Sequence, residues 1–267
     1  MSSVLCNSEA WFNLSKSDLD LLETVDTMLL RRILNAPKTT PREMLFLELG
    51  VTPLREIIRH KRLTFLKYIL DQNADSILFK VFEKQCEMRN KKDWVTTVIT
   101  DLEELGMNVT FVDIQQMNKQ KWKNIVKQNI KENTFSKLQE NKGRHSKVKH
   151  LQYSRFEMQD YLSPSGLKVT KEEVELIFKL RSNMVNLKMN YKGSYDSFEC
   201  KSCNNSEEKQ KHIYDECIQI RKEEKEYIGD IPEYDCVMKG DITEKFKVAK
   251  IFKEKLKIHE KIAKSIM

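Results

Sequence analysis

The sequence predicts a mainly α-helical protein, and three observations support this fold class. Only 7 of the 267 residues are glycine and 5 are proline, so signals for tight turns between strands are few. Apolar residues make up 40% of the chain and charged residues 33%, a balance that favours helices around a core over disorder. Apolar side chains also recur at steps of three and four, which is the period of a helix.

The first helices are expected within residues 17–70. A stripe on residues 17–34 consists of Leu19, Leu22, Val25, Leu29 and Ile33. A second helix starts at Thr40-Pro41-Arg42-Glu43, where the Thr40 hydroxyl can cap the Glu43 amide and the Glu43 carboxylate can return the bond. Gly50 is suited to end that helix, because glycine tolerates the left-handed conformation.

The helix predicted from Thr52-Pro53 to about residue 70 carries a row of three arginines: Arg55, Arg59 and Arg62. Such a row fits either a solvated helix face or contact with phosphates. Two helices then follow at 75–88 and 93–105, the second capped by Asp93 and closed by Gly106.

Positive charge is concentrated between residues 117 and 150, where ten Lys or Arg face two acids, against a net charge of +7 for the whole chain. We expect a helix over 118–141 and a flexible basic linker over 142–150. This charge indicates phosphate contact, a solvated face or a membrane surface. The candidate contacts are Lys119, Lys121, Lys123, Lys127, Arg144, Lys147 and Lys149.

Two aromatic residues near this charge could stack on nucleic-acid bases. Trp122 lies between Lys121 and Lys123, and Tyr153 follows the expected linker. The alternative for Trp122 is that it anchors its helix in the core. Further along, capping boxes at Thr170 and Asp241 predict helices to about residue 184 and to the C-terminus.

A zinc site is predicted from Cys200, Cys203, His212 and Cys217. Two cysteines three residues apart can direct both sulfurs to one ion, and four protein ligands leave no open position, so the single Zn²⁺ would be structural. The alternative is a set of reduced, buried cysteines beside a histidine. In a regular helix, residues five apart lie about 140° apart in rotation, so Cys217 is expected where the helix ends or distorts.

No secretory signal is recognised at the start of the sequence, so we expect an intracellular location, in the nucleus or cytoplasm, and no membrane partner. A phosphate-binding loop and a Tyr-x-Asp-Asp polymerase motif are both missing from the sequence. The remaining histidines are expected at the surface: His60, His145, His150 and His259. We therefore expect no catalytic centre in this chain.

Several motifs in order resemble the C-terminal part of a non-LTR retrotransposon reverse transcriptase polyprotein. The similar segments are Ser8–Trp11, Leu22–Asp26, Thr40–Leu45, Leu47–Pro53, Asp93-Trp94, Met117–Lys119, Tyr153, Gln159–Leu162, Phe178–Met184 and the Cys200–Cys217 cluster. The resemblance spans about residues 8–265. It implies a helical thumb and connector bundle, a small CCHC zinc knuckle and a C-terminal helix, with the polymerase and endonuclease centres upstream. The knuckle departs from the retroviral kind, because eight residues separate Cys203 from His212.

The resemblance implies a thumb-like and connector region over 1–141, a basic linker and helical region over 142–195, the knuckle over 196–225 and a helical tail over 226–267. The expected function is non-catalytic binding of template RNA and target DNA for RNA-directed DNA synthesis by the parent protein. The alternative is a helical, zinc-binding adaptor that joins proteins through the arginine row and the last helix. The protein partners are unknown.

Overall fold

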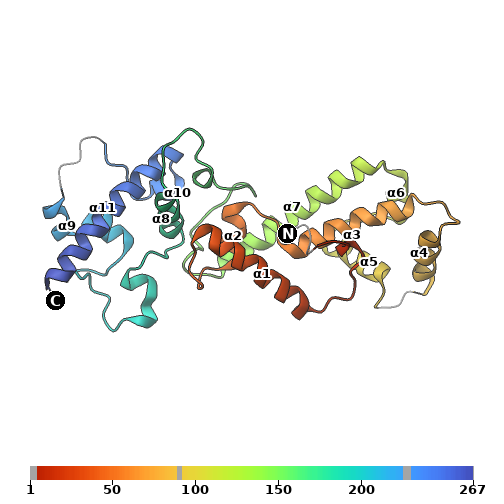
Figure 1. Cartoon of the computed structure of the whole chain (residues 1–267), viewed down its shortest axis with the longest axis horizontal. Coiled ribbons are helices and arrows are strands. Elements are labelled where there is room, and N and C mark those ends of the chain that lie inside the picture. The colour runs from red at the N-terminus through yellow and green to blue at the C-terminus, as the bar shows by residue number, and fades with distance from the viewer. Residues whose placement is uncertain (1–4, 89–91, 225–229, 267) are drawn as a thin grey trace. The chain divides into compact units, whose positions relative to one another are not determined.

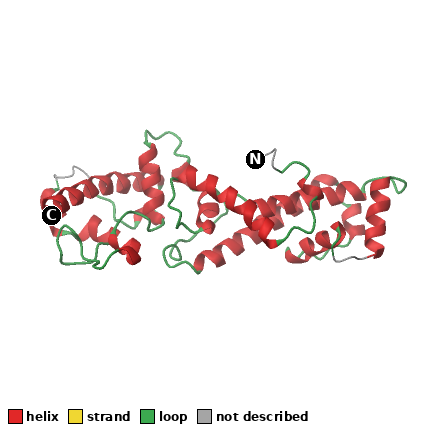
Figure 2. Cartoon of the chain, turned by 60° about the horizontal axis from the view of Figure 1, so that its bottom comes forward, coloured by secondary structure: helices red, strands yellow, loops and turns green. Residues whose placement is uncertain are grey.

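The computed structural model describes residues 5–88, 92–224 and 230–266 (Figure 1). Helices dominate, as expected, and the described residues contain no strand beyond an isolated bridge between Glu199 and Glu207 (Figure 2). The predicted mainly α class is confirmed.

The chain forms two compact units. Unit 1 comprises Met1–Leu29 and Val51–Leu138, and unit 2 comprises Leu30–Gly50 and Gln139–Met267. Two helices, α1 (Lys16–Leu34) and α7 (Lys119–Gly143), contribute residues to both. This division differs from the linear order of domains expected from the sequence, because residues 30–50 pack with the C-terminal part of the chain.

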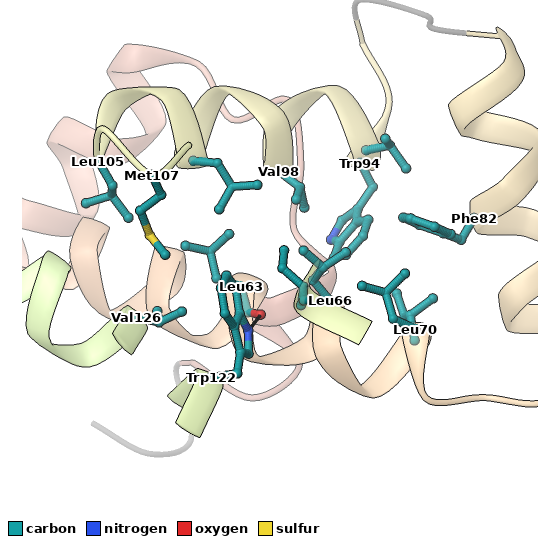
Figure 3. Packing of buried hydrophobic residues seen from close by; sticks show 14 of the residues in the cluster. Leu63, Leu66, Leu70, Phe82, Trp94, Val98, Leu105, Met107, Trp122 and Val126 are labelled. Carbon is teal, nitrogen blue, oxygen red and sulfur yellow. Dashed lines mark hydrogen bonds between the residues drawn. The ribbon is translucent and has the colours of Figure 1, made fainter. Parts of the chain in front are cut away.

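Unit 1 is built around α3 (Leu54–Leu70). The short helix η1 (Ser8–Ala10), α5 (Trp94–Glu104), α6 (Phe111–Gln116) and α4 (Ile77–Met88) contact it. Leu63, Leu66, Val98 and Trp122 are buried at the centre of the core (Figure 3). The Trp122 indole N–H donates to the Leu63 carbonyl over 2.8 Å, so burying this side chain leaves no polar atom unsatisfied.

Unit 2 contains α2 (Arg42–Leu49), α8 (Lys171–Arg181) and the long α11 (Ile242–Ile266). It also has the short helices η2 (Asp160–Leu162), η3 (Lys188–Ser194), η4 (His212–Glu216), α9 (Ile218–Glu223) and α10 (Cys236–Lys239). Glu48 of α2 is fully buried and accepts hydrogen bonds from the Tyr153 and Tyr161 hydroxyls, each at 2.6 Å, and from Arg181 at 3.1 Å. Unit 2 therefore encloses a charge that is both paired and hydrogen-bonded.

Several predicted helix ends are confirmed. The Thr170 and Asp241 capping boxes are present, and Asp93 caps α5 by accepting from the Thr96 amide. Gly50 ends α2 at φ +60°, and a Cβ added there would lie 2.3 Å from the Met158 nitrogen. Glycine is therefore required at position 50 both for its backbone conformation and for the close approach of a neighbouring segment.

The predicted cap at Thr40 is wrong. The helix begins one residue after Pro41, and the Thr40 hydroxyl is buried without a hydrogen bond to any described residue. Instead of returning a bond to Thr40, the Glu43 carboxylate lies 3.4 Å from Arg42 and 3.3 Å from His145. These two partners replace the reciprocal bond that the local motif suggested.

The helix α1 does not bury the predicted stripe. Leu19 and Leu22 pack against a small cluster of Leu5, Leu54 and Ile58, but Val25, Leu29 and Ile33 are exposed. The buried side chains further along the helix are Glu23, Asp26, Thr27, Leu30 and Leu34. The helix therefore turns a partly polar face inward and leaves apolar residues outside.

Residues 142–150 are packed rather than a flexible linker. Lys142 belongs to α7, and its ammonium donates to the Leu151 carbonyl. Val148 is fully buried, and the Lys147 carbonyl accepts from the Asn183 amide over 2.8 Å. Burial lowers the pKa of both Lys142 and Lys147. The sequence did not indicate that these side chains are buried, because the segment is rich in basic residues.

Candidate metal centre and basic surface

The four predicted metal ligands lie together in unit 2. One ligand atom from each of Cys200, Cys203, His212 and Cys217 falls within 4.8 Å of all the others. The Cys200 and Cys217 sulfurs are 4.0 Å apart, and the Cys203 sulfur is 3.3 Å from His212 Nε2. A tetrahedral ion with thiolate and imidazole ligands would place such atoms about 3.5–3.8 Å apart. The cluster could therefore hold one metal ion.

A tight turn positions the first two cysteines. The Asn204 amide donates to the Cys200 carbonyl over 2.9 Å, and Asn204 adopts a left-handed φ of +54°. The Cys200 amide in turn donates to the Ser206 carbonyl over 2.7 Å. These bonds fold residues 200–206 back on themselves, so that both sulfurs face the same point.

A distorted helix positions the other two ligands. Residues His212–Glu216 form a π-type turn, in which the Cys217 amide donates to the His212 carbonyl over 2.8 Å. Cys217 itself is extended, with φ −70° and ψ 108°, and precedes α9. The prediction that Cys217 lies where the helix ends or distorts is confirmed, because the wider turn returns the chain over His212 after five residues.

Without a cation the cluster disfavours thiolates. Burial raises the pKa of Cys200 to about 12, although the Ser202 and Cys203 amides oppose the shift; Cys217 also has a raised pKa because of burial. A bound divalent ion would reverse this preference by supplying the missing positive charge. The amides that point at the Cys200 sulfur would then stabilise the ligated thiolate.

Groups around the cluster fit a metal ligand set. The Nδ1 atom of His212 is buried and has no hydrogen-bond partner among the described residues, although the Glu216 carboxylate lies 3.6 Å away. If Nε2 binds the ion, Nδ1 carries the proton and faces this carboxylate, an arrangement common at metal-binding histidines.

A second contact layer joins the Cys200–Cys203 turn to α11. The Ser202 hydroxyl lies 2.5 Å from His259 Nδ1, and His259 Nε2 lies 3.3 Å from Glu208. All three side chains are buried, so the expectation of a surface His259 is wrong. Nothing near residue 259 in the sequence signals this contact, because its partners are about fifty residues away.

The arginine row is mostly internal. Arg59 donates to Asp101 over 3.0 Å and also pairs with Glu56 and Glu104, whereas Arg62 donates to Asp101 over 2.6 Å. Both arginines are about 6% exposed, so they balance acids of unit 1 and do not present a surface to phosphate. The third member, Arg55, is half-buried and pairs with Asp20 and Glu23.

Both predicted stacking residues are also buried. Trp122 is fully enclosed in the unit 1 core, as the alternative interpretation held. Tyr153 is 6% exposed and donates to Glu48, and burial raises its pKa well above the usual value. Neither ring is available to a base in this structure.

The predicted lysines at the start of α7, by contrast, lie at the surface. Lys119, Lys121, Lys123 and Lys127 on α7 are exposed, and their ammonium groups make no ion pair or hydrogen bond with the described residues. Further along, Lys149 is exposed, Arg144 pairs with Glu140 at 2.8 Å and Lys147 donates to the Asn190 carbonyl.

Comparisons with protein-family models, with curated proteins and with solved structures found no match to this chain. Within the described ranges, no helix combines the length and the apolar character needed to cross a membrane.

Proposed function

We propose that this chain is a non-catalytic nucleic-acid-binding protein that carries one structural zinc ion. The observation that carries the proposal is the group of four unpaired lysines at the start of α7. Elsewhere in unit 1, the buried arginines are matched by carboxylates, whereas these ammonium groups have no partner among the described residues. Unmatched surface cations are the groups that neutralise phosphates.

The spacing of these lysines supports an extended polyanion as the ligand. Lys119, Lys123 and Lys127 recur every four residues, so they form one row along the helix, and Lys121 lies on another side. A row of point charges can follow successive phosphates without reading sequence. We therefore expect binding with modest sequence specificity.

Zinc is the ion that best suits the metal centre. Three thiolates and one imidazole match a borderline-soft ion that accepts tetrahedral coordination, whereas magnesium and calcium prefer oxygen ligands. Four protein ligands would leave no position for substrate or water. The ion would supply folding free energy to unit 2 and take no part in a reaction.

The resemblance to the C-terminal region of a non-LTR retrotransposon reverse transcriptase remains a proposal. The helical fold and the order of basic helix and CCHC cluster along the chain support it. In this interpretation the chain helps to hold template RNA and target DNA for a polymerase domain located elsewhere in the parent protein.

A salt titration tests the nucleic-acid proposal. Binding of labelled duplex DNA and structured RNA to the full chain is followed by fluorescence anisotropy. If four lysines contact phosphates, a plot of the logarithm of the association constant against the logarithm of the salt concentration should have a slope of about −3 to −4. Replacing the four lysines by glutamine should reduce both affinity and slope. Affinity that does not change with salt would contradict the proposal.

Metal content tests the zinc proposal separately. Native mass spectrometry of the full chain should find one zinc per molecule, and Cys200→Ser should lose it. The matched control is Cys6→Ser, because Cys6 is exposed and distant in sequence from the ligands. Retention of zinc by Cys200→Ser, or its loss from both variants, would contradict the assignment of these ligands.

A second candidate function, a protein-interaction adaptor, is favoured by one observation. Large apolar side chains on the surface of α1 are exposed by 68% at Leu21, 54% at Val25 and 53% at Met28. Such a stripe fits a partner helix or groove. The arginine row no longer supports the adaptor, because two of its members are buried. If Leu21→Ser and Met28→Ser abolish capture of a protein partner while the lysine variant retains it, the adaptor interpretation is favoured.

A further inference from the structure

Unit 1 has a shallow depression between α3 and the first turns of α7. It is lined by His60, Lys61, Thr64, Tyr68, Lys119 and Lys123, together with Phe65 and Glu9. The depression combines an exposed aromatic ring with two of the unpaired lysines. None of the predicted stacking residues lies in it.

The ring of Tyr68 is exposed but held in place. It stacks on Phe65 with ring centroids 5.7 Å apart and an angle of 15° between the planes, and Phe65 meets Trp94 edge-on at 5.9 Å. Trp94 is fixed in turn, because its indole N–H donates to the Glu9 carbonyl over 2.8 Å. Tyr68 is nevertheless 46% exposed, so the ring offers a supported apolar surface to solvent.

Three lysines line the same depression as this ring. Lys119 and Lys123 are exposed and unpaired within the described chain, whereas Lys61 is held by the Leu5 carbonyl at 2.5 Å and lies 4.0 Å from Glu9. The negative charge of Glu9 is therefore balanced by Lys61, and the ammonium groups of Lys119 and Lys123 remain available to a ligand.

We propose that this depression binds one nucleotide of a single-stranded nucleic acid, with its base stacked on Tyr68 and the flanking phosphates at Lys119 and Lys123. This inference rests on the proposed nucleic-acid-binding function and names the form of nucleic acid bound. An aromatic ring can stack on any base, and neighbouring cations follow the backbone, so the site would tolerate many sequences.

Single strands fit the depression better than a duplex does. Bases inside a duplex are already stacked on each other and do not present a face to a side chain, whereas an unpaired base does. A duplex would meet the lysines alone. An acidic peptide could also satisfy the lysines, but it would gain nothing from the flat surface of Tyr68.

The test compares variants of the full chain in binding to labelled oligothymidine, to the same strand with abasic sites and to a hairpin duplex. Tyr68→Ala should weaken binding of oligothymidine by on the order of fivefold or more, and Tyr68→Phe should keep most of it. The same Tyr68→Ala change should not alter binding of the abasic strand or the duplex. Phe12→Ala is the control, because Phe12 is similarly exposed and lines a different depression.

The outcomes separate the two proposals. If the unmodified chain binds neither strand nor duplex, the proposed function fails. If it binds both, but Tyr68→Ala matches the Phe12→Ala control on oligothymidine, only the Tyr68 site is refuted. Equal losses on the abasic strand would also refute base stacking, and polyglutamate that binds the unmodified chain as tightly as oligothymidine does would assign the site to acidic peptides. Tryptophan fluorescence during urea unfolding shows whether each variant is folded.

Discussion

Replacing Asp101 by asparagine should destabilise unit 1 strongly. Asp101 accepts from both Arg59, at 3.0 Å, and Arg62, at 2.6 Å, and all three side chains are less than 10% exposed. Arg59 would keep Glu56 and Glu104, but Arg62 would keep only the carbonyl oxygen of Trp11 as a described partner. A buried guanidinium would then lose its matching charge.

The magnitude follows from the two bonds that change. Each hydrogen bond between charged groups is worth about 1.5–3 kcal/mol, and removing one partner of a buried ion pair costs about 3–5 kcal/mol. We therefore expect Asp101→Asn to lower the free energy of unfolding of unit 1 by about 3–5 kcal/mol. For a unit of this size that corresponds to a fall in Tm on the order of 10 °C or more.

Tryptophan fluorescence measures this change in unit 1 alone. The three tryptophans of the chain, Trp11, Trp94 and Trp122, all belong to that unit. Urea unfolding is compared with Asp75→Asn, which removes an exposed carboxylate 3.2 Å from Lys80 and should change stability by less than about 1 kcal/mol. If both variants unfold at the same urea concentration, the arginines are not held in a buried network, and the row returns as a candidate phosphate surface.

Three further substitutions test other parts of the fold. Gly50→Ala should lower the free energy of unfolding of unit 2 by about 1–2 kcal/mol or more, because Gly50 has a positive φ and lies against the Met158 backbone. An unchanged Tm in thermal unfolding would contradict that geometry. Burial alone would raise the pKa of Glu208, but hydrogen bonds from His259 and two backbone amides lower this pKa to about 2. The ionised carboxylate therefore stabilises the fold fully above pH 4.5, and this contribution is lost as the pH falls toward 2. In thermal unfolding followed by circular dichroism, Glu208→Gln should therefore have a lower Tm than the unmodified chain at neutral pH, and the difference should vanish in acid. Burial, and to a lesser extent the charge of Glu23, raises the pKa of Asp26. The ionised carboxylate therefore destabilises unit 1 at pH 7, so Asp26→Asn should raise its stability there, with no gain below pH 3.8. A loss of stability at pH 7 would show that the carboxylate has a favourable partner.

Local patterns predicted most of the helices, and they predicted that Cys200, Cys203, His212 and Cys217 lie together. Capping boxes at Thr170 and Asp241 act over three residues, and the CxxC turn acts over four, so the sequence contains all that is needed to recognise them. The five-residue step from His212 to Cys217 even required a distortion of the helix, which is present.

Long-range pairing was not predictable from the sequence. From the sequence, phosphate contact was one of two interpretations of the arginine row, because its partner Asp101 lies about forty residues away on another helix. Hydrophobic periodicity likewise predicted too long a buried stripe on α1. Leu19 and Leu22 do pack against the cluster that contains Leu54 and Ile58, but nothing in the sequence indicated that the rest of the stripe is exposed. Trp122 was identified correctly as a helix residue, but only packing decides between a core anchor and a stacking surface.

The contact between Ser202 and His259 has a consequence for how the metal centre can be isolated. A peptide covering 196–225 contains all four candidate ligands, yet it lacks the imidazole that holds the Cys200–Cys203 turn through Ser202 and Glu208. During synthesis the ligands would emerge from the ribosome before residue 259 does. Full preorganisation of the cluster must therefore wait for α11, and the excised peptide should release a zinc ion bound to it faster than the whole chain does.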